Sequence, residues 1–495
     1  MTKEKAFPVK IGLEVHGYLN TREKLFCMCR AQAQELGDRG QDLGVNDRIC
    51  PICTGTPGSK PMGVNGEAVR KMVEVALILS SRISVGDLVW QRKHYSWADL
   101  PKGYQNTISG PHSMPCAIGG KFRGINIIEA HLEEDPAQWN PDNGKINYNR
   151  SGLPLIEIVT EPEFSDAEQV VEWLKNLVLS LSYVKAVRKN AGIKVDVNVS
   201  TYGERVEMKN LNSLEKIRKA IEYEIARQSE IVESMKLEVG SEKLKELLPR
   251  ETRMFDEKSG TTIKMRSKEG VADYRFIPEP DLPVLRISKK LIEEVRKSLP
   301  EMPEVKLERL LKKFKVSESD AKILTGNLEL VEFFEALVEI EKGKISIRTN
   351  TDKHGFEKMV SWVTVELLRV LNYNRKTLED EDVEILPEHL AELIGAVSSG
   401  KITVLKAKQI MNDFMPRSFS ISEGNDVGKI GDDAIENLCR QVVDENSHVV
   451  DEFRNGKLAS LNYLIGQVMR LSERRAGPDE VREILKKMVG KSEVD

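Results

Sequence analysis

The apolar residues of this chain change their spacing once, and that change limits the folds available to it. Before about residue 294, segments in which apolar and polar residues alternate lie between helical segments, whereas beyond it apolar residues recur almost entirely at helical spacing. A proline-rich run, residues 277–283, lies just before the change. The sequence therefore predicts an α+β protein with a mixed α/β domain at residues 1–294 and helices beyond it.

The helical part contains a second joint. A glycine-bearing stretch from Ser422 to Gly431 predicts a helical domain at residues 295–425 and a separate helical tail at residues 426–495. The tail ends in an expected helix that opens with Pro478 and two acidic residues. From Gly456 to Lys491 it carries 8 Lys and Arg against 4 Asp and Glu, which is a local charge of +4.

The overall charge, in contrast, is nearly balanced. The 74 basic and 78 acidic residues give a formal net charge of −4, so any contact with RNA must be local. The N-terminal residues contain no apolar signal-peptide core, and no apolar run is long enough to cross a bilayer. We therefore expect a cytoplasmic protein with no membrane partner.

Four of the six cysteines form two closely spaced pairs, Cys27 with Cys29 and Cys50 with Cys53. Thiolate pairs at such spacing typically close a tetrahedral Zn²⁺ site on a loop, whereas six cysteines are too few for a disulfide framework in 495 residues. Because four thiolates leave no open position, the zinc predicted for the loop 27–53 is structural. The alternative is four buried free cysteines.

A second constellation combines carboxylates with histidines. Glu14 and His16 share one face of an alternating strand, residues 131–135 read His-Leu-Glu-Glu-Asp, and Glu157 lies within an apolar strand. Carboxylate oxygens from several strands suit Mg²⁺, which keeps water ligands and bridges to nucleotide phosphates. From these residues alone, a phosphoryl-transfer metal site and a structural salt-bridge network are equally good interpretations.

Other polar residues gather in turns and at strand ends. Cations and aromatic residues follow one another in residues 92–95 and 99–105, a pattern that suits phosphate or a polar ligand but also a solvated loop. Asp196 and Asn198 share a strand face, and residues 207–213 form a similar polar run. These runs predict ligand-facing strand ends. The chain has no GxxxxGK[ST] motif, so ATP would need a site other than a P-loop.

The order of several sequence blocks resembles one known family. The blocks IGLEVHGYLNTREKLFC, CPIC, RKHYSWADLPKGYQ, HLEED, SGLPLIEIVTEP, EMKNLNS and DYRFIPEPDLP are similar to those of the GatB family, the B subunit of the aspartyl/glutamyl-tRNA(Asn/Gln) amidotransferase. In the tail, NGKLASLNYLIGQVM and PDEVREILKKM resemble the YqeY-type domain that contacts the body of the tRNA in this family. The resemblance covers nearly the whole chain.

In this family the mixed domain is a cradle that binds ATP and Mg²⁺. The resemblance implies that the Mg²⁺ ligands, which are also the catalytic residues, are Glu14, His16, Glu134 and Glu157. The substrate and ATP contacts that we expect are Lys93, Tyr95, Lys102, Tyr104, Arg150, Asp196, Asn198, Glu207, Lys209, Asn210, Asn212, Asp273, Tyr274 and Arg275. By the resemblance, Lys93, Tyr95 and Lys102 match positions at the inner end of the channel that delivers ammonia in this family.

The activity that the resemblance implies is ATP-dependent transamidation of mischarged Asp-tRNA(Asn), Glu-tRNA(Gln) or both, a carbon–nitrogen ligase reaction with glutamine as the amido donor. The γ-phosphoryl group of ATP would pass to the side-chain carboxylate of the aminoacyl-tRNA, and ammonia would then displace phosphate. The chain lacks the signature of an amidase. The implied partners are therefore an amidase that supplies ammonia and a small third subunit, which with this chain form the GatCAB complex, together with mischarged tRNA and a non-discriminating synthetase.

Two other interpretations compete with this one. The paralogous GatE protein shares the IGLEVH and EED blocks but carries a large inserted domain, for which this chain has no room. A non-catalytic, zinc-stabilised tRNA-binding scaffold would explain the acidic cluster as a salt-bridge network. The segment His94 to Ala98 departs from the Asn-Tyr-Phe-Tyr-Pro-like stretch of most relatives, which leaves its substrate or channel role open.

Overall fold

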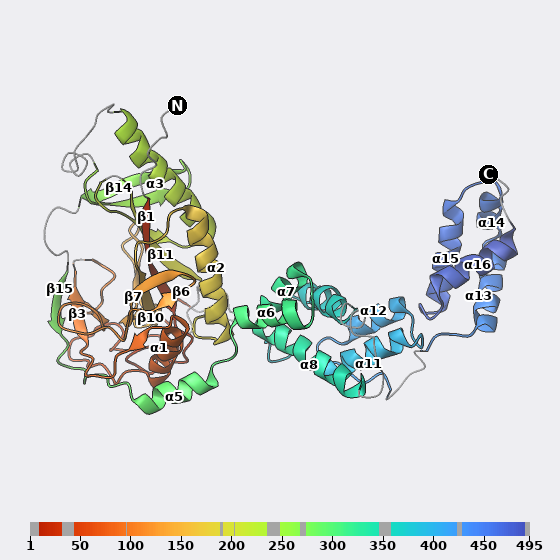
Figure 1. Ribbon diagram of the computed structural model, residues 1–495, viewed down its shortest axis with the longest axis horizontal. Coiled ribbons are helices and arrows are strands. Elements are labelled where there is room, and N and C mark those ends of the chain that lie inside the picture. The colour runs from red at the N-terminus through yellow and green to blue at the C-terminus, as the bar shows by residue number, and fades with distance from the viewer. Residues whose placement is uncertain are drawn as a thin grey trace. The chain divides into compact units, whose positions relative to one another are not determined.

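The chain divides into two compact units, residues 1–302 and residues 303–495. Figure 1 shows that the first unit mixes strands with helices and that the second is built of helices. This division confirms the predicted α+β class, with a mixed N-terminal part and a helical C-terminal part. The residues that the computed structural model describes are 9–31, 44–95, 97–188, 192–201, 203–234, 248–267, 274–345, 358–422 and 428–490.

One large sheet forms the centre of the first unit. Among the described residues it has 13 strands, and its main path runs β14-β13-β12-β11-β1-β10-β7-β4-β3-β15, while β6 and the β2–β5 pair attach at β7. Neighbours along this path are antiparallel except for β12 and β13. The strands are β1 (Lys10–Tyr18), β2 (Arg82–Ile83), β3 (Gln91–His94), β4 (Gln105–Thr107), β5 (Ala117–Ile118), β6 (Lys121–Phe122), β7 (Ile125–Glu134), β10 (Pro154–Thr160), β11 (Ile193–Ser200), β12 (Val206–Leu211), β13 (Glu251–Asp256), β14 (Thr261–Ser267) and β15 (Arg275–Pro278), with β8 (Gln138–Trp139) and β9 (Ile146–Asn147) paired separately.

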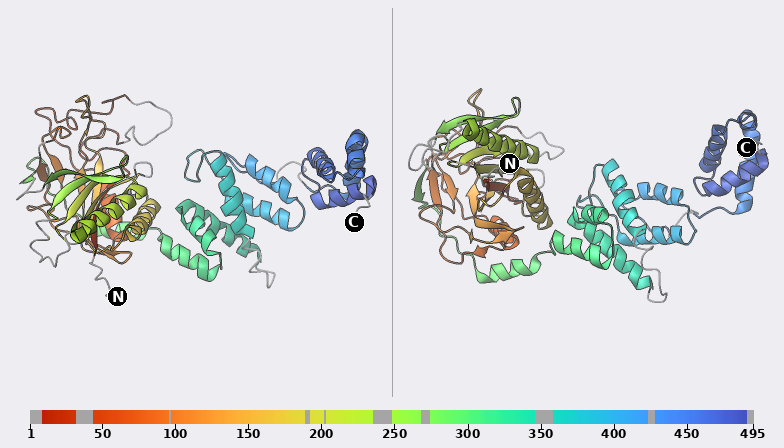
Figure 2. Two further views of the ribbon diagram at one scale, coloured as in Figure 1. Left: turned by 90° about the horizontal axis from the view of Figure 1, so that it is seen from above. Right: turned by 45° about the horizontal axis from the view of Figure 1, so that its top comes forward.

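Helices cover one face of this sheet. They are α1 (Gly66–Ile78), α2 (Ala167–Tyr183) and α3 (Leu214–Ser234), and α5 (Lys289–Ser298) packs on α1. The views in Figure 2 show the yellow-green α2 and α3 lying side by side along the sheet. Alternate strand residues such as Leu13, Ile156 and Val197 enter the hydrophobic core with helix residues such as Trp173 and Ile221. The residues between them must therefore lie on the opposite face of the sheet.

The second unit consists of short helices. They are α6 (Pro303–Lys313), α7 (Glu318–Thr325), α8 (Leu328–Ile345), the π-helical η2 (Trp362–Leu367), α10 (Leu368–Tyr373), α11 (Pro387–Ser398), α12 (Val404–Asp413), α13 (Asp432–Glu445), α14 (Ser447–Arg454), α15 (Ala459–Leu471) and α16 (Pro478–Val489). Helices α13 to α16 share a hydrophobic core that includes Ile435, Leu464 and Leu485. In the described part of the chain, no helix combines the length and apolar character needed to span a membrane.

Candidate functional site

A row of charged side chains crosses the sheet face opposite the helices. The strand register places Glu157 of β10 between His16 of β1 and His131 of β7. On the other side of β1, Glu14 lies opposite Asp196 of β11. Because alternate residues of a strand share a face, all five side chains lie on this side while the apolar residues between them enter the core.

Glu157 lies between two histidines. Its Oε2 atom is 3.3 Å from Nε2 of His16 and 3.4 Å from Nε2 of His131. Burial raises the pKa of the Glu157 carboxyl, but the two histidines outweigh it and hold that pKa well below its ordinary value. Burial lowers the pKa of both imidazoles, and Glu157 in turn raises it above the ordinary value. The carboxylate is therefore ionised at neutral pH although it is buried.

Glu133 extends this arrangement towards β3. Its Oε1 atom lies 3.5 Å from Nε2 of His131 and 3.6 Å from Nζ of Lys93. The Lys93 ammonium is also 4.9 Å from the ring centre of Tyr274, and Tyr95 meets Tyr274 edge-on with ring centres 5.6 Å apart. Burial lowers the pKa of Lys93, but nearby carboxylates raise it above its ordinary value. Three predicted substrate contacts therefore lie beside the charged row.

A second set of acidic residues lies on the other side of β1. Ligand oxygens of Glu14, Asp196 and Glu207, which we name the carboxylate group, lie within 4.8 Å of one another. Nζ of Lys209 lies 2.8 Å from Asp196 and 2.6 Å from Glu207, and Nδ2 of Asn198 donates to Glu14 at 3.1 Å. Burial and the neighbouring carboxylates raise the pKa of Glu14. The structure thus brings four predicted contacts, Asp196, Asn198, Glu207 and Lys209, together with Glu14.

The four predicted Mg²⁺ ligands do not all share this face. Glu14, His16 and Glu157 do, but Glu134 points to the opposite face of β7. There it accepts a hydrogen bond from Nζ of Lys102 and another, at 3.1 Å, from a backbone N–H of β4. The structure therefore does not bring Glu134 to the other three residues.

Glu133 lies on the charged face instead of Glu134. Ligand atoms of His16, Glu133 and Glu157, which we name the histidine group, lie within 4.8 Å of one another. Two adjacent residues of a strand cannot face the same side, so only one of the two glutamates can join this group. The signal was present in the sequence, because Glu133 is two residues from His131 and Glu134 is three.

The remaining predicted contacts lie outside the charged row. Tyr104 lies beside Lys102, whose ammonium is 5.1 Å from the ring centre. Arg150 donates hydrogen bonds to the backbone carbonyls of Pro136 and Ala137, and its Nε atom lies 2.9 Å from the carboxylate of Asp135. Asn212 and Arg275 are exposed. Two further predicted contacts are Asp273, which lies outside the described residues, and Asn210, whose side chain lies outside the described side chains.

The four predicted zinc ligands converge on one point. The Sγ atoms of Cys27, Cys29, Cys50 and Cys53 lie within 4.8 Å of one another. The pKa of the Cys53 thiol is lowered to about 5, chiefly because Cys27 donates a hydrogen bond to it, and the pKa of Cys27 is raised by the same contact. Oγ of Ser151 donates to the Cys53 carbonyl at 2.7 Å, which ties the loop to the chain before β10. The group could hold a metal ion and is compatible with structural zinc.

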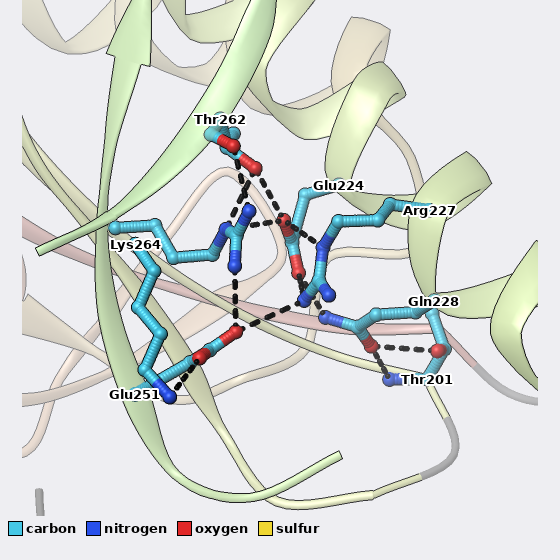
Figure 3. Close-up of polar contacts among 8 residues, drawn as sticks. Thr201, Glu224, Arg227, Gln228, Glu251, Thr262 and Lys264 are labelled. Atoms are coloured by element: carbon cyan, nitrogen blue, oxygen red, sulfur yellow. Dashed lines mark hydrogen bonds and ion pairs between the residues drawn. The ribbon is translucent and has the colours of Figure 1, made fainter. Parts of the chain in front are cut away.

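A buried polar network joins α3 to β13 and β14 (Figure 3). The carboxylate of Glu224, which is fully buried, accepts hydrogen bonds from Arg227 at 2.5 and 3.0 Å and from Thr262 at 3.0 Å. Strand β13 pairs with β12, and Oγ1 of Thr252 donates to Glu207 at 3.2 Å. The network thus holds in place the strand that carries part of the carboxylate group.

Comparison with known proteins places the two units in one class. A family model described as the GatB/GatE catalytic domain matches residues 9–293, and one described as the GatB domain matches residues 332–489. The first unit, which carries the charged face, is therefore a catalytic domain of the GatB/GatE class.

Curated relatives narrow this class to one family. Three that are named as the B subunit of aspartyl/glutamyl-tRNA(Asn/Gln) amidotransferase come from Methanocaldococcus jannaschii (38% identical, covering 98% of this chain and 98% of the relative), Methanosphaera stadtmanae (37%, 96% and 98%) and Methanopyrus kandleri (38%, 97% and 98%). The chain belongs to the GatB family, as its sequence blocks predicted.

Proposed function

We propose that this chain is the B subunit of a tRNA-dependent amidotransferase. Its mixed unit would activate the side-chain carboxylate of mischarged Asp-tRNA(Asn), Glu-tRNA(Gln) or both at the expense of ATP. Family membership and the names of the relatives support the amidotransferase role. The observation that carries the chemical part of the proposal is the row of buried carboxylates and histidines on one sheet face, with the ammonium groups of Lys93 and Lys209 beside it.

The charged face fits a divalent cation and phosphates. Buried carboxylates need a positive partner, and the histidine group offers two carboxylates and an imidazole nitrogen as ligands. These residues, with Glu14 beside them, would hold Mg²⁺, which would offset the repulsion between the ATP phosphates and the substrate carboxylate. Lys93 and Lys209 would bind phosphate oxygens, because their ammonium groups lie on the same face and stay charged.

The reaction needs no nucleophile from this chain. The carboxylate oxygen of the aminoacyl group attacks the γ-phosphorus of ATP and ADP leaves, which produces an acyl phosphate. Ammonia then attacks the acyl carbon, phosphate leaves, and the amide forms after loss of a proton. The role of the charged face is to bind and orient the two anions, which repel each other in solution.

Three further assignments belong to the same proposal. The zinc on the four cysteines is structural, because four thiolates fill a tetrahedral site. The tail from residue 426, which resembles a YqeY-type domain, contacts the body of the tRNA. An amidase and a small third protein form, with this chain, the complex that delivers ammonia, so this chain alone should release no ammonia from glutamine.

A reconstituted assay tests the proposal. The chain, its amidase partner and the small third protein of the complex are mixed with mischarged tRNA, ATP, Mg²⁺ and glutamine, and ADP and amidated aminoacyl-tRNA are quantified with each tRNA in turn. Formation of both products only when the chain is present supports the proposal. If tRNA binds but neither product forms, the chain is a zinc-stabilised scaffold instead.

A further inference from the structure

Lys24 lies just before the first pair of zinc-loop cysteines and is buried. It is 1% exposed, which makes it the least exposed cationic residue in the described part of the chain. Its backbone N–H donates to the Cys29 carbonyl at 3.0 Å, so Lys24 belongs to the turn that carries Cys27 and Cys29. Moving an ammonium group out of water is strongly unfavourable unless an opposite charge lies near it. Lys24 therefore needs a negative partner.

No described carboxylate is that partner. Nζ of Lys24 donates hydrogen bonds to the backbone carbonyls of Arg48 at 3.1 Å and Tyr148 at 3.2 Å, and it forms no ion pair with an Asp or Glu among the described residues. The other two buried lysines of the described chain, Lys306 and Lys406, each pair with a glutamate. Carbonyl groups are neutral, so they satisfy the donors of Lys24 without balancing its charge.

The cysteine cluster lies beside Lys24. A methyl group built on Gly152 would lie 3.6 Å from Cδ of Lys24 and 3.7 Å from Cβ of Cys53, so both side chains pack over this glycine. Gly152 has φ +82°, a conformation that favours glycine, and no side chain at this position separates the two. The Lys24 charge also lowers the pKa of the Cys53 thiol, to a smaller extent than the hydrogen bond from Cys27 does. The four sulfurs are therefore within electrostatic reach of the ammonium group.

A zinc ion held by four cysteines leaves a negative centre. Four thiolates carry four negative charges against the two positive charges of Zn²⁺, so the centre has an excess of two. We infer that Lys24 is the buried counter-ion of this centre and raises the affinity of the loop for zinc. The ammonium offsets part of the excess, and the centre supplies the opposite charge that a buried lysine needs. This inference rests on the zinc assigned in the proposed function, and it gives Lys24 no part in the reaction.

A purely mechanical role is the alternative for Lys24. Its two hydrogen bonds join residue 48 of the zinc loop to residue 148, which precedes β10, and a neutral donor would serve that purpose equally well. A counter-ion, in contrast, requires the positive charge. Lys24→Gln keeps N–H donors and removes the charge, whereas Lys24→Arg keeps both, so these two variants separate the roles.

The zinc affinity of the full-length chain tests the inference, measured by competition with a chelator of known affinity at constant pH. We expect Lys24→Gln to weaken zinc binding by roughly ten- to a hundredfold, the usual effect of changing a residue that supports metal ligands. Lys24→Arg should stay close to the natural chain. The matched control is Lys60→Gln, which removes a cation whose side chain is 69% exposed and should leave zinc binding unchanged, because solvent screens that charge.

A change in the cluster itself checks that the effect comes from charge. Cys29→His replaces one thiolate with a neutral imidazole, which halves the excess negative charge while a zinc ligand remains. In that background Lys24→Gln should weaken zinc binding by a clearly smaller factor. If Lys24→Gln alone does not fold, adding Cys29→His should restore zinc binding and the fold, measured by circular dichroism.

A zinc affinity in Lys24→Gln within about twofold of the natural value overturns the inference. So does an equal loss in both backgrounds, or an unfolded Lys24→Gln that Cys29→His does not rescue, because either result leaves Lys24 only the mechanical role. If the natural chain binds no zinc, the zinc assignment fails together with this inference. The amidation activity of the reconstituted complex is measured separately, so the amidotransferase proposal stands or fails independently of all these results.

Discussion

Replacing Glu224 with alanine should strongly destabilise the first unit. The Glu224 side chain is fully buried and accepts hydrogen bonds from Arg227, Gln228 and Thr262 at distances between 2.5 and 3.0 Å (Figure 3). Nε of Arg253 also lies 3.6 Å from its carboxylate. Alanine would leave two guanidinium groups without one of their carboxylate partners in a region with little water.

The expected loss in the free energy of unfolding depends on the carboxylate that remains beside the two guanidinium groups. Removing one member of a buried ion pair usually costs about 3–5 kcal/mol, because the other charge stays buried. Glu251 still lies 3.4 Å from Arg227 and 2.8 Å from Arg253, so part of the compensation remains. We expect the free energy of unfolding to fall by about 3 kcal/mol in Glu224→Ala and by about 1–2 kcal/mol in Glu224→Gln, which keeps an acceptor oxygen.

Urea unfolding measures this loss, with tryptophan fluorescence as the probe, because four of the five tryptophans lie in the first unit. One of them, Trp173, is buried on α2, which packs on α3. The matched control is Glu215→Ala on the same helix, since Glu215 is half exposed and pairs with Arg218 on the surface. It should leave the free energy of unfolding nearly unchanged, because solvent screens a surface ion pair. A loss of under about 1 kcal/mol in the free energy of unfolding of Glu224→Ala would refute the reasoning, because breaking a buried charge pair should cost more than that.

Three further outcomes are expected. Cys50→Ala should lower the zinc content and the thermal stability of the chain while the rate of amidation per folded complex stays unchanged; a change in that rate without loss of zinc would contradict a structural role. Truncation after Glu423 should weaken tRNA binding, measured by filter retention, more than ATP binding, and equal affinities for tRNA would remove the tail from that role. Glu366→Gln should lower the free energy of unfolding by about 1 kcal/mol at pH 7 but not at pH 3. Burial raises the pKa of Glu366, but the ion pairs with Lys408 and Arg369 outweigh it and lower that pKa, so they stabilise the fold above the unfolded pKa and cease to do so as the pH falls. An equal loss at both pH values in thermal unfolding would contradict this.

The fold class could be predicted because apolar spacing is local information. In β1, for example, the alternation that places Leu13 in the core and Glu14 on the opposite face follows directly from the strand repeat. Packing between distant segments is not visible in this way. The helical spacing of α5 does not show which unit the helix belongs to. The structure places it in the first unit, because Val295 joins that core and Ser298 accepts a hydrogen bond from Arg70 at 2.8 Å.

The candidate site shows the same limit. Most of the residues proposed to bind metal or substrate could be found by type and strand position, but their partners could not. Lys93 meets Glu133 and the ring of Tyr274 only because β3 lies between β4 and β15 in the sheet, and β15 is about 180 residues further along the chain. The choice between Glu133 and Glu134, in contrast, follows from the strand alternation of β7, which the sequence contains but a resemblance between sequence blocks does not use.

The most direct test of the central claim is tRNA-dependent ATP cleavage by the reconstituted complex that carries Glu157→Gln. Glu157 is a buried carboxylate of the histidine group, and glutamine keeps its shape while removing its charge. We expect the rate of ADP formation to fall by roughly a hundredfold or more, while the dissociation constant for tRNA stays unchanged. Normal ATP cleavage in this variant would show that the charged face of the sheet does not activate the substrate.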